Sequence, residues 1–266
     1  MTDQLLFVES PATGHTAVTD ELQLLTLNVQ HANAERGRRQ AEWLARQEMA
    51  DVLVLTEVGY RASSEALMTG LAQRGYGSVL VIPSVSGSPD LRTVLASRSA
   101  SLEALCFSVG LPHRAPAAEV RIGNHVVALL GLYVPSRADL LKKRSFQDDV
   151  ASAVPVLVDG FSGPVIVSGD LNVLEPDHTP RHTAFRTWEY SFYSSFLKAG
   201  LVDAFRHLHP DDVEHSWFSP RGNGYRYDHT FVTADHADRI RLCQYVHEPR
   251  ELGLTDHSAM LLRLGL

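Results

Sequence analysis

The sequence has little cysteine, no long apolar run and no excess of positive charge. Its two cysteines, Cys106 and Cys243, are far apart in apolar, strand-like segments. A disulfide between them stays open, but we expect two buried free thiols in a reducing compartment. No segment approaches the roughly 18 consecutive apolar residues of a membrane helix, and the N-terminal MTDQLLFVES lacks the basic and apolar parts of a signal peptide. We therefore expect a cytoplasmic protein with no membrane partner.

Positive charge is in deficit. The chain has 24 Lys and Arg against 31 Asp and Glu, a net charge of −7. A protein that coats nucleic acid non-specifically needs clustered Lys and Arg to release counterions, so this class is disfavoured. An enzyme that grips a phosphodiester locally, through metal ions and a few arginines, remains open. The basic clusters at 36–39 and 142–144 fit either such contacts or solvated helix faces.

The chain also lacks a Pro- or Ser-rich linker, a repeat and any low-complexity tract. Of its 266 residues, 44% are hydrophobic and 21% are charged, which is a globular composition. Residues 1–20 have weak periodicity and are expected to form a loose leader. We expect residues 21–266 to form one domain.

Hydrophobic periodicity predicts alternating strands and helices. Helices are expected over residues 35–49, 63–75, 139–158 and 187–199. Strands are expected over residues 22–29, 51–58, 77–83, 91–97, 102–108, 118–122, 125–135, 164–170, 214–219, 225–233, 239–246 and 258–264. The strands between 91 and 133 leave no room for helices, so we expect antiparallel neighbours there. The pattern predicts an α/β fold of two mixed sheets packed together with helices outside.

Polar residues stand at the ends of several hydrophobic strands. These residues are Asn28, Glu57, Tyr133, Asp170, Asn172, Asp228, Asp256 and His257. A single carboxylate after an apolar strand is more often a loop residue than a ligand. In layered α/β proteins, however, ligands collect at strand ends. Because the pattern recurs along the chain, we expect these side chains to converge.

The stretch SGDLNV, residues 168–173, places a carboxylate and a carboxamide two positions apart. If the chain is extended here, Asp170 and Asn172 lie on the same side of it. An ordinary turn is the alternative interpretation.

The residue types at these strand ends suit phosphoester hydrolysis. Oxygen ligands without cysteine or paired histidines favour a hard cation such as Mg²⁺ or Mn²⁺. Zinc is disfavoured because the sequence contains neither HExxH nor CxxC. Beside such a metal, an Asp can activate water while His, Asn and Tyr stabilise the charge that develops on phosphorus.

The motifs that carry these residues resemble those of the endonuclease/exonuclease/phosphatase superfamily. LNVQ, LTEV, LYVPS, SGDLN, YRYDH and TDHSAM occur in the order expected of it and span nearly the whole chain. The segment GLVDAFRHLHPDDVEHSWFSPRGNGYRYDH resembles the exonuclease III group of apurinic/apyrimidinic endonucleases. This resemblance implies a four-layer α/β sandwich and a Mg²⁺- or Mn²⁺-dependent DNA repair nuclease that cuts at abasic sites and trims 3′ ends. We expect it to act on DNA as a monomer.

The resemblance also implies roles for the residues at the strand ends. Glu57 would be the principal metal ligand, with Asn28 beside it and Asp256 as a further ligand or a partner of the metal's ligands. Asp170 would position and deprotonate the attacking water, and Asn172 would bind the phosphate.

Three further roles follow from the same resemblance. His257 would contact the scissile phosphate, oriented or kept charged by Asp228, and Tyr133 would donate a hydrogen bond to the phosphate or leaving group or assist as a phenolate. Structural alternatives exist: Tyr133 as a packed core residue, Asp228 as an ion-pair partner of Arg226, and Asn28 as a residue that satisfies backbone groups.

Substrate contacts are less well defined. Tyr225 and Trp217, with Phe218, are candidates for an aromatic wall against a base-less sugar, and core packing is the alternative for them. For the nucleic-acid backbone, the candidates are Arg137, Arg181 and His182.

One departure from the family pattern concerns the metal. Gln30 stands where many relatives carry Asp or Asn, which weakens the case for a second metal position.

Two other functions stay open. The first is a phosphatase or phosphodiesterase of the same fold that acts on an inositol phosphate, a lipid headgroup or a small nucleotide, which the negative charge favours. The second is a binding or scaffold protein that keeps the fold without catalysis. The complete set of polar residues at the strand ends argues against that role.

Overall fold

The computed structural model describes residues 20–46, 50–60, 62–84 and 90–266. The strands are β1 (Glu21–Asn28), β2 (Val52–Val58), β3 (Ser78–Val81), β4 (Arg92–Ser97), β5 (Ser101–Leu105), β6 (Ala117–Ile122), β7 (His125–Tyr133), β8 (Val165–Asp170), β9 (Leu201–Asp203), β10 (Trp217–Phe218), β11 (Gly224–Tyr225), β12 (Asp228–Thr233), β13 (Ile240–Val246) and β14 (Ala259–Gly265). The α-helices are α1 (Ala34–Arg46), α2 (Ala62–Ala72), α3 (Leu140–Gly160), α4 (Thr187–Lys198), α5 (Ala204–Leu208) and α6 (Glu248–Glu251). Two 3₁₀ helices cover Pro112–Arg114 and Ala234–Arg239.

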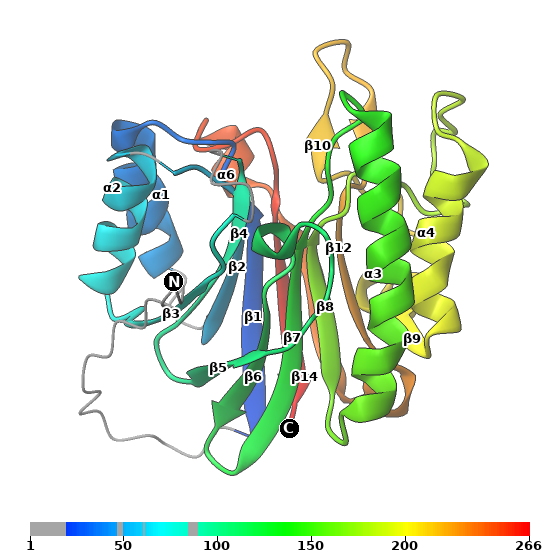
Figure 1. The fold of residues 1–266 in the computed structure, drawn as a ribbon. Coiled ribbons are helices and arrows are strands. Elements are labelled where there is room, and N and C mark those ends of the chain that lie inside the picture. The colour runs from blue at the N-terminus through cyan, green and yellow to red at the C-terminus, as the bar shows by residue number, and fades with distance from the viewer. Residues whose placement is uncertain (1–19, 47–49, 61, 85–89) are drawn as a thin grey trace.

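Two six-stranded sheets form the centre of the molecule (Figure 1). Their strand orders are β13-β14-β1-β2-β4-β3 and β5-β6-β7-β8-β12-β9. Each sheet is mixed, because β1 pairs with β2 and β7 with β8 in parallel while the other pairs are antiparallel. The predicted antiparallel run is confirmed for β5, β6 and β7, whereas β4 belongs to the other sheet.

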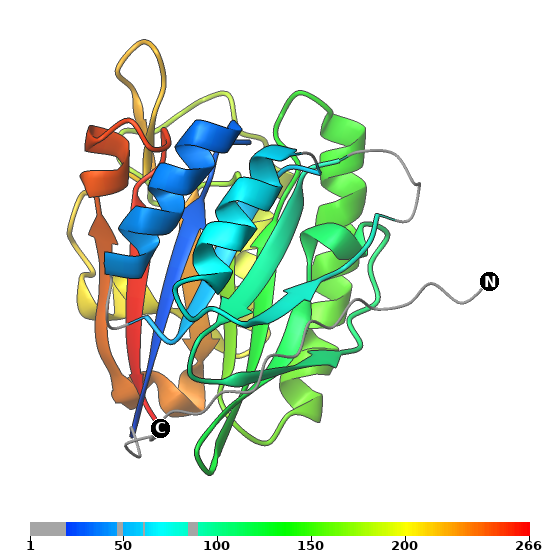
Figure 2. The ribbon, with the colours of Figure 1, turned by 90° about the vertical axis from the view of Figure 1, so that its left-hand side faces the viewer.

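Helices cover the outer face of each sheet, which gives the predicted four-layer α/β sandwich. Helices α1 and α2 lie against the first sheet, and α3 and α4 against the second (Figures 1 and 2). The core between the sheets contains Leu24 and Val54 of the first sheet and Leu129 and Ile166 of the second, all at most 1% exposed. Because each sheet is covered by the other sheet on its inner face and by helices on its outer face, both faces of the central strands are buried.

Amphipathic helices complete the outer layers. Trp43 and Leu44 of α1 pack on the first sheet, and Phe146 of α3 and Phe196 of α4 pack on the second. Helix α3 begins where the side chain of Asp139 accepts a hydrogen bond from the N–H of Lys142, as expected of an N-cap.

Several local predictions need correction. The predicted strand over 225–233 is two elements, β11 and β12, because Arg226 and Tyr227 lie between the two paired segments. The short elements β9 and α5 were not predicted, since three and five residues carry too little periodicity to show in the sequence. Both cysteines are free, and Cys243 is buried as predicted, but Cys106 is exposed.

The fold does not test the predicted leader or the predicted start of the domain. The predicted leader falls on residues 1–19, outside the described residues, so it stays a prediction together with the domain boundary at residue 21. Among the described helices, none combines the length and apolar character needed to cross a bilayer.

Candidate active site

The register of the sheets brings the predicted polar strand ends together. Tyr133 of β7 and Asp228 of β12 are the paired neighbours of Asp170 on the two sides of β8. Asn28, at the end of β1 in the other sheet, donates from Nδ2 to Asp170 Oδ2 at 2.9 Å. The Nε2 atom of His257 lies 3.4 Å from the same Asn28 nitrogen. Residues far apart in the sequence therefore meet where the two sheets face each other.

Asp170 and Asn172 are neighbours, but not for the predicted reason. Asp170 is the last residue of β8, and Asn172 lies beyond it in the left-handed region with φ of 50°. The backbone N–H of Asn172 donates to Asp170 Oδ1 at 2.9 Å, and its side-chain amide donates to Asp170 Oδ2 at 3.2 Å. A turn that folds back on the carboxylate therefore joins them, so the prediction from extended alternation was wrong.

Glycine is required directly before the carboxylate. A β-carbon added to Gly169 would lie 1.9 Å from the carbonyl oxygen of Leu132 in the adjacent strand. This close approach brings the end of β8 against β7, where Tyr133 is paired with Asp170.

Glu57 reaches the site through an irregularity in β2. The pairing of β2 with β4 shifts register between Leu55 and Val58, and Glu57 itself has φ of 56°. Bulges of this kind re-aim a side chain, and a positive φ is unusual for Glu. The Glu57 carboxylate accepts a hydrogen bond from the Tyr133 hydroxyl at 3.0 Å.

Tyr133 is a buried donor. Burial first, and then the negative charges of Glu57 and Asp170, raise the pKa of Tyr133 well above its usual range. Arg114 lies over its ring at 4.4 Å and acts in the opposite direction without reversing the shift. Of the two predicted roles, this environment favours a neutral phenol that donates a hydrogen bond over a phenolate.

His257 and Asp228 form a buried pair. His257 Nδ1 lies 2.7 Å from Asp228 Oδ2, with the two side chains 7% and 1% exposed. Burial by itself would lower the pKa of His257, but the charge of Asp228, the hydrogen bond to it and the charge of Asp170 raise it to about 10. The imidazole is therefore held as a cation whose Nε2 faces Asn28 and the site.

Asp170 is unusually basic for a carboxylate. Burial, followed by the charge of Asp228, raises the pKa of Asp170 to about 8, while His257 acts in the opposite direction. When it is ionised, a carboxylate with this proton affinity is a stronger base toward water than an ordinary one, and its ionised fraction grows as the pH rises through about 8. Its two oxygens are already oriented by Asn28 and Asn172.

The residues predicted to hold a metal carry the donors that a hard cation prefers. Asp256 Oδ2 accepts a hydrogen bond from Trp217 Nε1 at 2.8 Å, whereas its Oδ1 is buried and has no partner among the described residues. Asp228 Oδ1 is orphaned in the same way. Glu57 adds to the negative charge that raises the pKa of Asp170, and a cation would relieve that repulsion.

The described residues contain no group of three or more His, Cys, Asp or Glu side chains arranged to hold a metal. A hard cation such as Mg²⁺ commonly takes one or two protein carboxylates and completes its shell with other oxygens. Asn28 contributes its amide to Asp170 and accepts the Gln30 N–H on Oδ1 at 2.8 Å. These contacts make it a positioning residue for Asp170, and its role at a metal stays a prediction, as do those of Glu57 and Asp256.

The predicted aromatic wall lies beside this cluster. Trp217 forms a backbone bridge with His257, and its ring centroid is 5.4 Å from that of Tyr225. Tyr225 in turn stacks on Tyr227 at 5.1 Å and on His182 at 4.1 Å. Trp217 and Tyr225 are partly buried residues, so the role of this surface at a substrate stays a prediction, with core packing as its alternative.

Of the three residues predicted to contact the nucleic-acid backbone, two are bound to other groups of the protein. Arg137 forms an ion pair with the buried carboxylate of Glu189 and has a side chain 30% exposed. His182 Nε2 lies 3.0 Å from the carbonyl oxygen of Gly224, and Arg181 is exposed. Within the described part of the chain, none of these three residues forms a hydrogen bond or an ion pair with Asp170. Their role at a substrate stays a prediction.

The basic cluster at 142–144 is not a single surface patch. Lys142 pairs with Asp90 at 2.8 Å, while Lys143 is fully buried and pairs with Glu189 at 2.7 Å. Sequence reasoning missed Lys143 and Glu189 as parts of the site, because a lysine in a run of basic residues gives no sign that it is buried.

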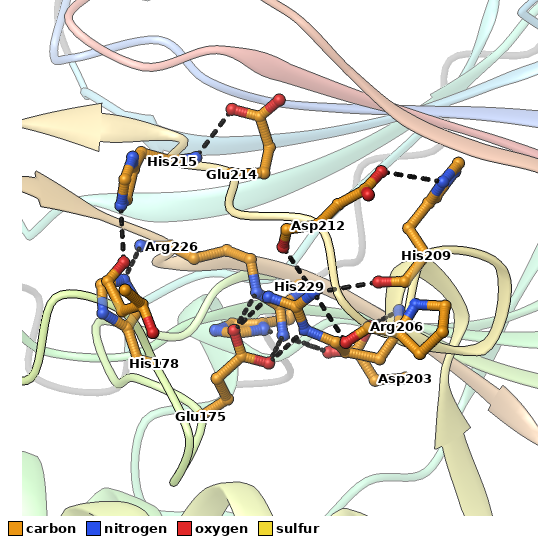
Figure 3. Close-up of polar contacts among 12 residues, drawn as sticks. Glu175, His178, Asp203, Arg206, His209, Asp212, Glu214, His215, Arg226 and His229 are labelled. Carbon is orange, nitrogen blue, oxygen red and sulfur yellow. Dashed lines mark hydrogen bonds and ion pairs between the residues drawn. The ribbon is translucent and has the colours of Figure 1, made fainter.

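A second missed feature is a buried ion-pair network between the loop after β8 and the segment before β12 (Figure 3). Arg206 and Arg226 both donate to Glu175, and Arg226 also donates to Asp203 at 2.7 Å. Arg226 therefore does not pair with Asp228, which rules out the alternative interpretation of that carboxylate. The network fixes the two segments that lead to and from the site.

Comparison with known proteins identifies the family of the chain. Residues 25–257 match the Endonuclease/Exonuclease/phosphatase family. An exodeoxyribonuclease of Bacillus subtilis (strain 168) is 34% identical over 91 residues, which cover 29% of this chain and 36% of that protein. The match therefore spans about a third of that relative's length.

Solved structures share the fold over most of the chain. An AP endonuclease from Archaeoglobus fulgidus superposes with a TM-score of 0.74 at 22% identity, covering 92% of this chain and 100% of that one. The 3′-5′ exonuclease NExo from Neisseria meningitidis gives 0.75 at 20% identity, with the same coverage of 92% and 100%. A structure of the 3′ phosphatase NExo from Neisseria bound to product DNA hairpin gives 0.74 at 20% identity, again covering 92% and 100%. By its matched residues, the chain belongs to the endonuclease/exonuclease/phosphatase family.

Proposed function

We propose that the protein is a Mg²⁺- or Mn²⁺-dependent phosphodiesterase that acts on DNA, as an AP endonuclease and 3′-5′ exonuclease of DNA repair. One observation carries the proposal: the Asn28–Asp170–Asn172 contacts and the Asp228–His257 pair form a single buried cluster. The same cluster holds a basic carboxylate next to a cationic imidazole, which is the combination that hydrolysis of an anionic phosphoester requires.

In this proposal Asp170 is the general base. Its raised pKa lets it accept the proton of the attacking water, and the amides of Asn28 and Asn172 fix the direction of its carboxylate. Asn172 is partly exposed, and it would bind a phosphate oxygen by turning its side-chain amide away from Asp170 or Val134. A metal ion held by Glu57 and Asp256 would supply Lewis-acid polarisation of the phosphoryl group.

His257 stabilises negative charge on the phosphate. Its proton on Nδ1 is directed at Asp228, which leaves the Nε2 proton of the imidazolium to donate toward the site. Tyr133 acts as a neutral phenol that orients the Glu57 carboxylate through its hydroxyl hydrogen bond.

Two observations support DNA as the substrate. Structural relatives are named as AP endonucleases and as a 3′-5′ exonuclease, and one of them is described bound to a DNA hairpin product. Trp217 lies beside His257 and Tyr225 lies beside Trp217, and because both residues are only partly buried, an unpaired sugar or base can pack against them.

A second candidate is a phosphatase or phosphodiesterase for a small substrate such as an inositol phosphate, a lipid headgroup or a nucleotide. The net charge of −7 favours it, and so does the pairing of Arg137, Lys142 and Lys143 with carboxylates, which withdraws those cations from a DNA backbone.

One assay separates the two candidates. The protein is incubated with Mg²⁺ and a duplex that carries a single tetrahydrofuran abasic analogue, and separately with a soluble inositol phosphate. Scission at the analogue supports the repair nuclease. Release of phosphate from the second substrate alone would establish the small-substrate enzyme instead.

Chelation tests the chemistry itself. Excess EDTA should abolish hydrolysis, and Mg²⁺ or Mn²⁺ should restore it, whereas full activity in EDTA would contradict the proposal. Loss of hydrolysis in Asp170→Ala and His257→Ala would show that the cluster is responsible. If both variants kept every activity, a binding or scaffold role would become the better explanation.

A further inference from the structure

A buried ammonium group lies directly behind the segment that carries Asp170 and Asn172. Lys143, in the first turn of α3, has a side chain with 0% exposure. Its Nζ donates to the carbonyl oxygen of Asn172 at 2.7 Å and to Glu189 Oε1 at 2.7 Å. A charge is costly to bury unless it is paired and hydrogen-bonded, and both partners here are specific.

Glu189 gathers the segments around this ammonium group. Its carboxylate, 0% exposed, binds Lys143 of α3 and Arg137 of the segment after β7, and it accepts the N–H of Arg186 at 2.9 Å before α4. Phe185 lies near both cations, with its ring centroid 4.9 Å from the guanidinium carbon and 5.7 Å from the ammonium nitrogen. Three separate segments are thus fixed relative to the Asn172 carbonyl.

The carbonyl matters because Asn172 holds a strained conformation. With φ of 50°, it directs its N–H and its side-chain amide back at the two oxygens of Asp170. Such a conformation persists only where the surroundings over-determine it. The Asn172 amide also donates to the carbonyl of Val134 at 3.0 Å, so the residue is held from the side chain and from the backbone.

We propose that Lys143, held in place by Glu189, is a positioning residue for Asn172 and through it for the Asp170 carboxylate. The inference rests on the proposed function, in which Asn172 binds phosphate and Asp170 accepts a proton. Lys143 itself lies behind the loop and acts through these two residues.

The first test replaces the ammonium group without shortening the side chain. Lys143→Met should lower kcat for phosphodiester hydrolysis by about 10- to 100-fold, the range seen when partners of site residues are removed. The change in KM should be much smaller. Combined with Asn172→Ala, Lys143→Met should add little further loss, because groups that act through one another are not additive.

A matched control comes from α4. Tyr193 is buried and donates from its hydroxyl to Asp203 Oδ2 at 2.8 Å, and it forms no hydrogen bond with Asn172. Tyr193→Phe therefore removes a buried hydrogen bond from the same helix as Glu189 and should leave kcat unchanged. Hydrogen exchange of a peptide covering residues 168–174 should become faster in Lys143→Met and stay the same in Tyr193→Phe.

A second variant keeps the test decisive if Lys143→Met does not fold. Lys143→Met combined with Glu189→Gln removes both charges of the buried pair, which avoids an uncompensated carboxylate. It should show the same loss of kcat and the same faster exchange. Wild-type kcat and wild-type exchange in a folded variant would overturn the inference, as would losses that multiply fully with Asn172→Ala.

The two proposals fail in different ways. A wild-type protein that hydrolyses no phosphoester would overturn the proposed function. Hydrogen exchange at residues 168–174 would still decide whether Lys143 holds this segment, since that readout does not depend on activity.

Discussion

The ion-pair network around the loop after β8 should make the folding stability of the protein depend on acid pH through one carboxylate, that of Glu175. Glu175 accepts hydrogen bonds from Arg206 at 2.7 and 2.7 Å and from Arg226 at 3.1 and 2.6 Å. Burial alone would raise the pKa of Glu175, but the two guanidinium groups lower it to about 2. The carboxylate side chain is 7% exposed, so solvent screens this interaction little.

The pKa shift of Glu175 sets how much its ion pairs contribute to the folding free energy. The difference between the ordinary pKa of 4.5 and a pKa of about 2 corresponds to about 3 kcal/mol of folding free energy. Because the pKa is lower in the folded state, this contribution is fully present above pH 4.5. It is lost as the pH falls from 4.5 toward 2, where Glu175 is protonated in both states.

Glu175→Gln keeps the shape of the side chain and removes its charge. We expect its free energy of unfolding to lie about 3 kcal/mol below that of the wild type at pH 7, and this gap should close as the pH falls. Urea unfolding followed by circular dichroism at pH 7, 5 and 3 measures it. Asp211→Asn, an exposed change in the neighbouring loop, should alter stability by no more than about 0.5 kcal/mol. A gap that stayed constant from pH 7 to pH 3 would refute the linkage to Glu175.

Three further predictions concern the site itself. Asp170→Asn should lower kcat for phosphodiester hydrolysis by about 10²- to 10⁴-fold without changing the far-ultraviolet circular dichroism, and activity near wild type would exclude it as the base. Glu57→Gln should raise the Mg²⁺ concentration needed for half-maximal activity, measured by titrating Mg²⁺; an unchanged titration curve would remove Glu57 from the metal site. Gly169→Ala should cost about 3 kcal/mol or more, measured by thermal unfolding, because its β-carbon would lie 1.9 Å from the Leu132 carbonyl oxygen. Gly77→Ala, where nothing lies within 4 Å, is the control.

The layered fold could be predicted because its signals are local. Strand Val165–Asp170 begins with an unbroken apolar run, and helix Thr187–Lys198 shows its apolar face in the sequence, with Gly200 soon after its end. The convergence of Asn28, Asp170 and His257 followed from the position of each at a strand end. These predictions depended on patterns within a few residues, and tertiary packing did not change the elements that the patterns predicted.

The parts that could not be predicted depend on contacts between distant residues. Glu57 was expected in the site from its place at a strand end, but the bulge in β2 and the positive φ that direct it there carry no signal in the sequence. Lys143 is buried because its partners, the Asn172 carbonyl and Glu189, are 29 and 46 residues away in the sequence. Asp170 and Asn172 meet through a turn, and the sequence could not decide between that turn and an extended chain.

Backbone strain and buried charge occur together in this molecule, and their coincidence explains how the site keeps its shape. Among the described non-glycine residues, those with positive φ are Gln30, His31, Glu57 and Asn172. Glu57 and Asn172 carry candidate site groups, and Gln30 donates its N–H to Asn28. Each strained residue is costly on its own. The Tyr133 hydroxyl on Glu57 and the Lys143 ammonium on Asn172 supply the compensating contacts. A site built in this way is already arranged before substrate arrives. Loss of a supporting contact should therefore lower kcat more than it lowers affinity for the substrate.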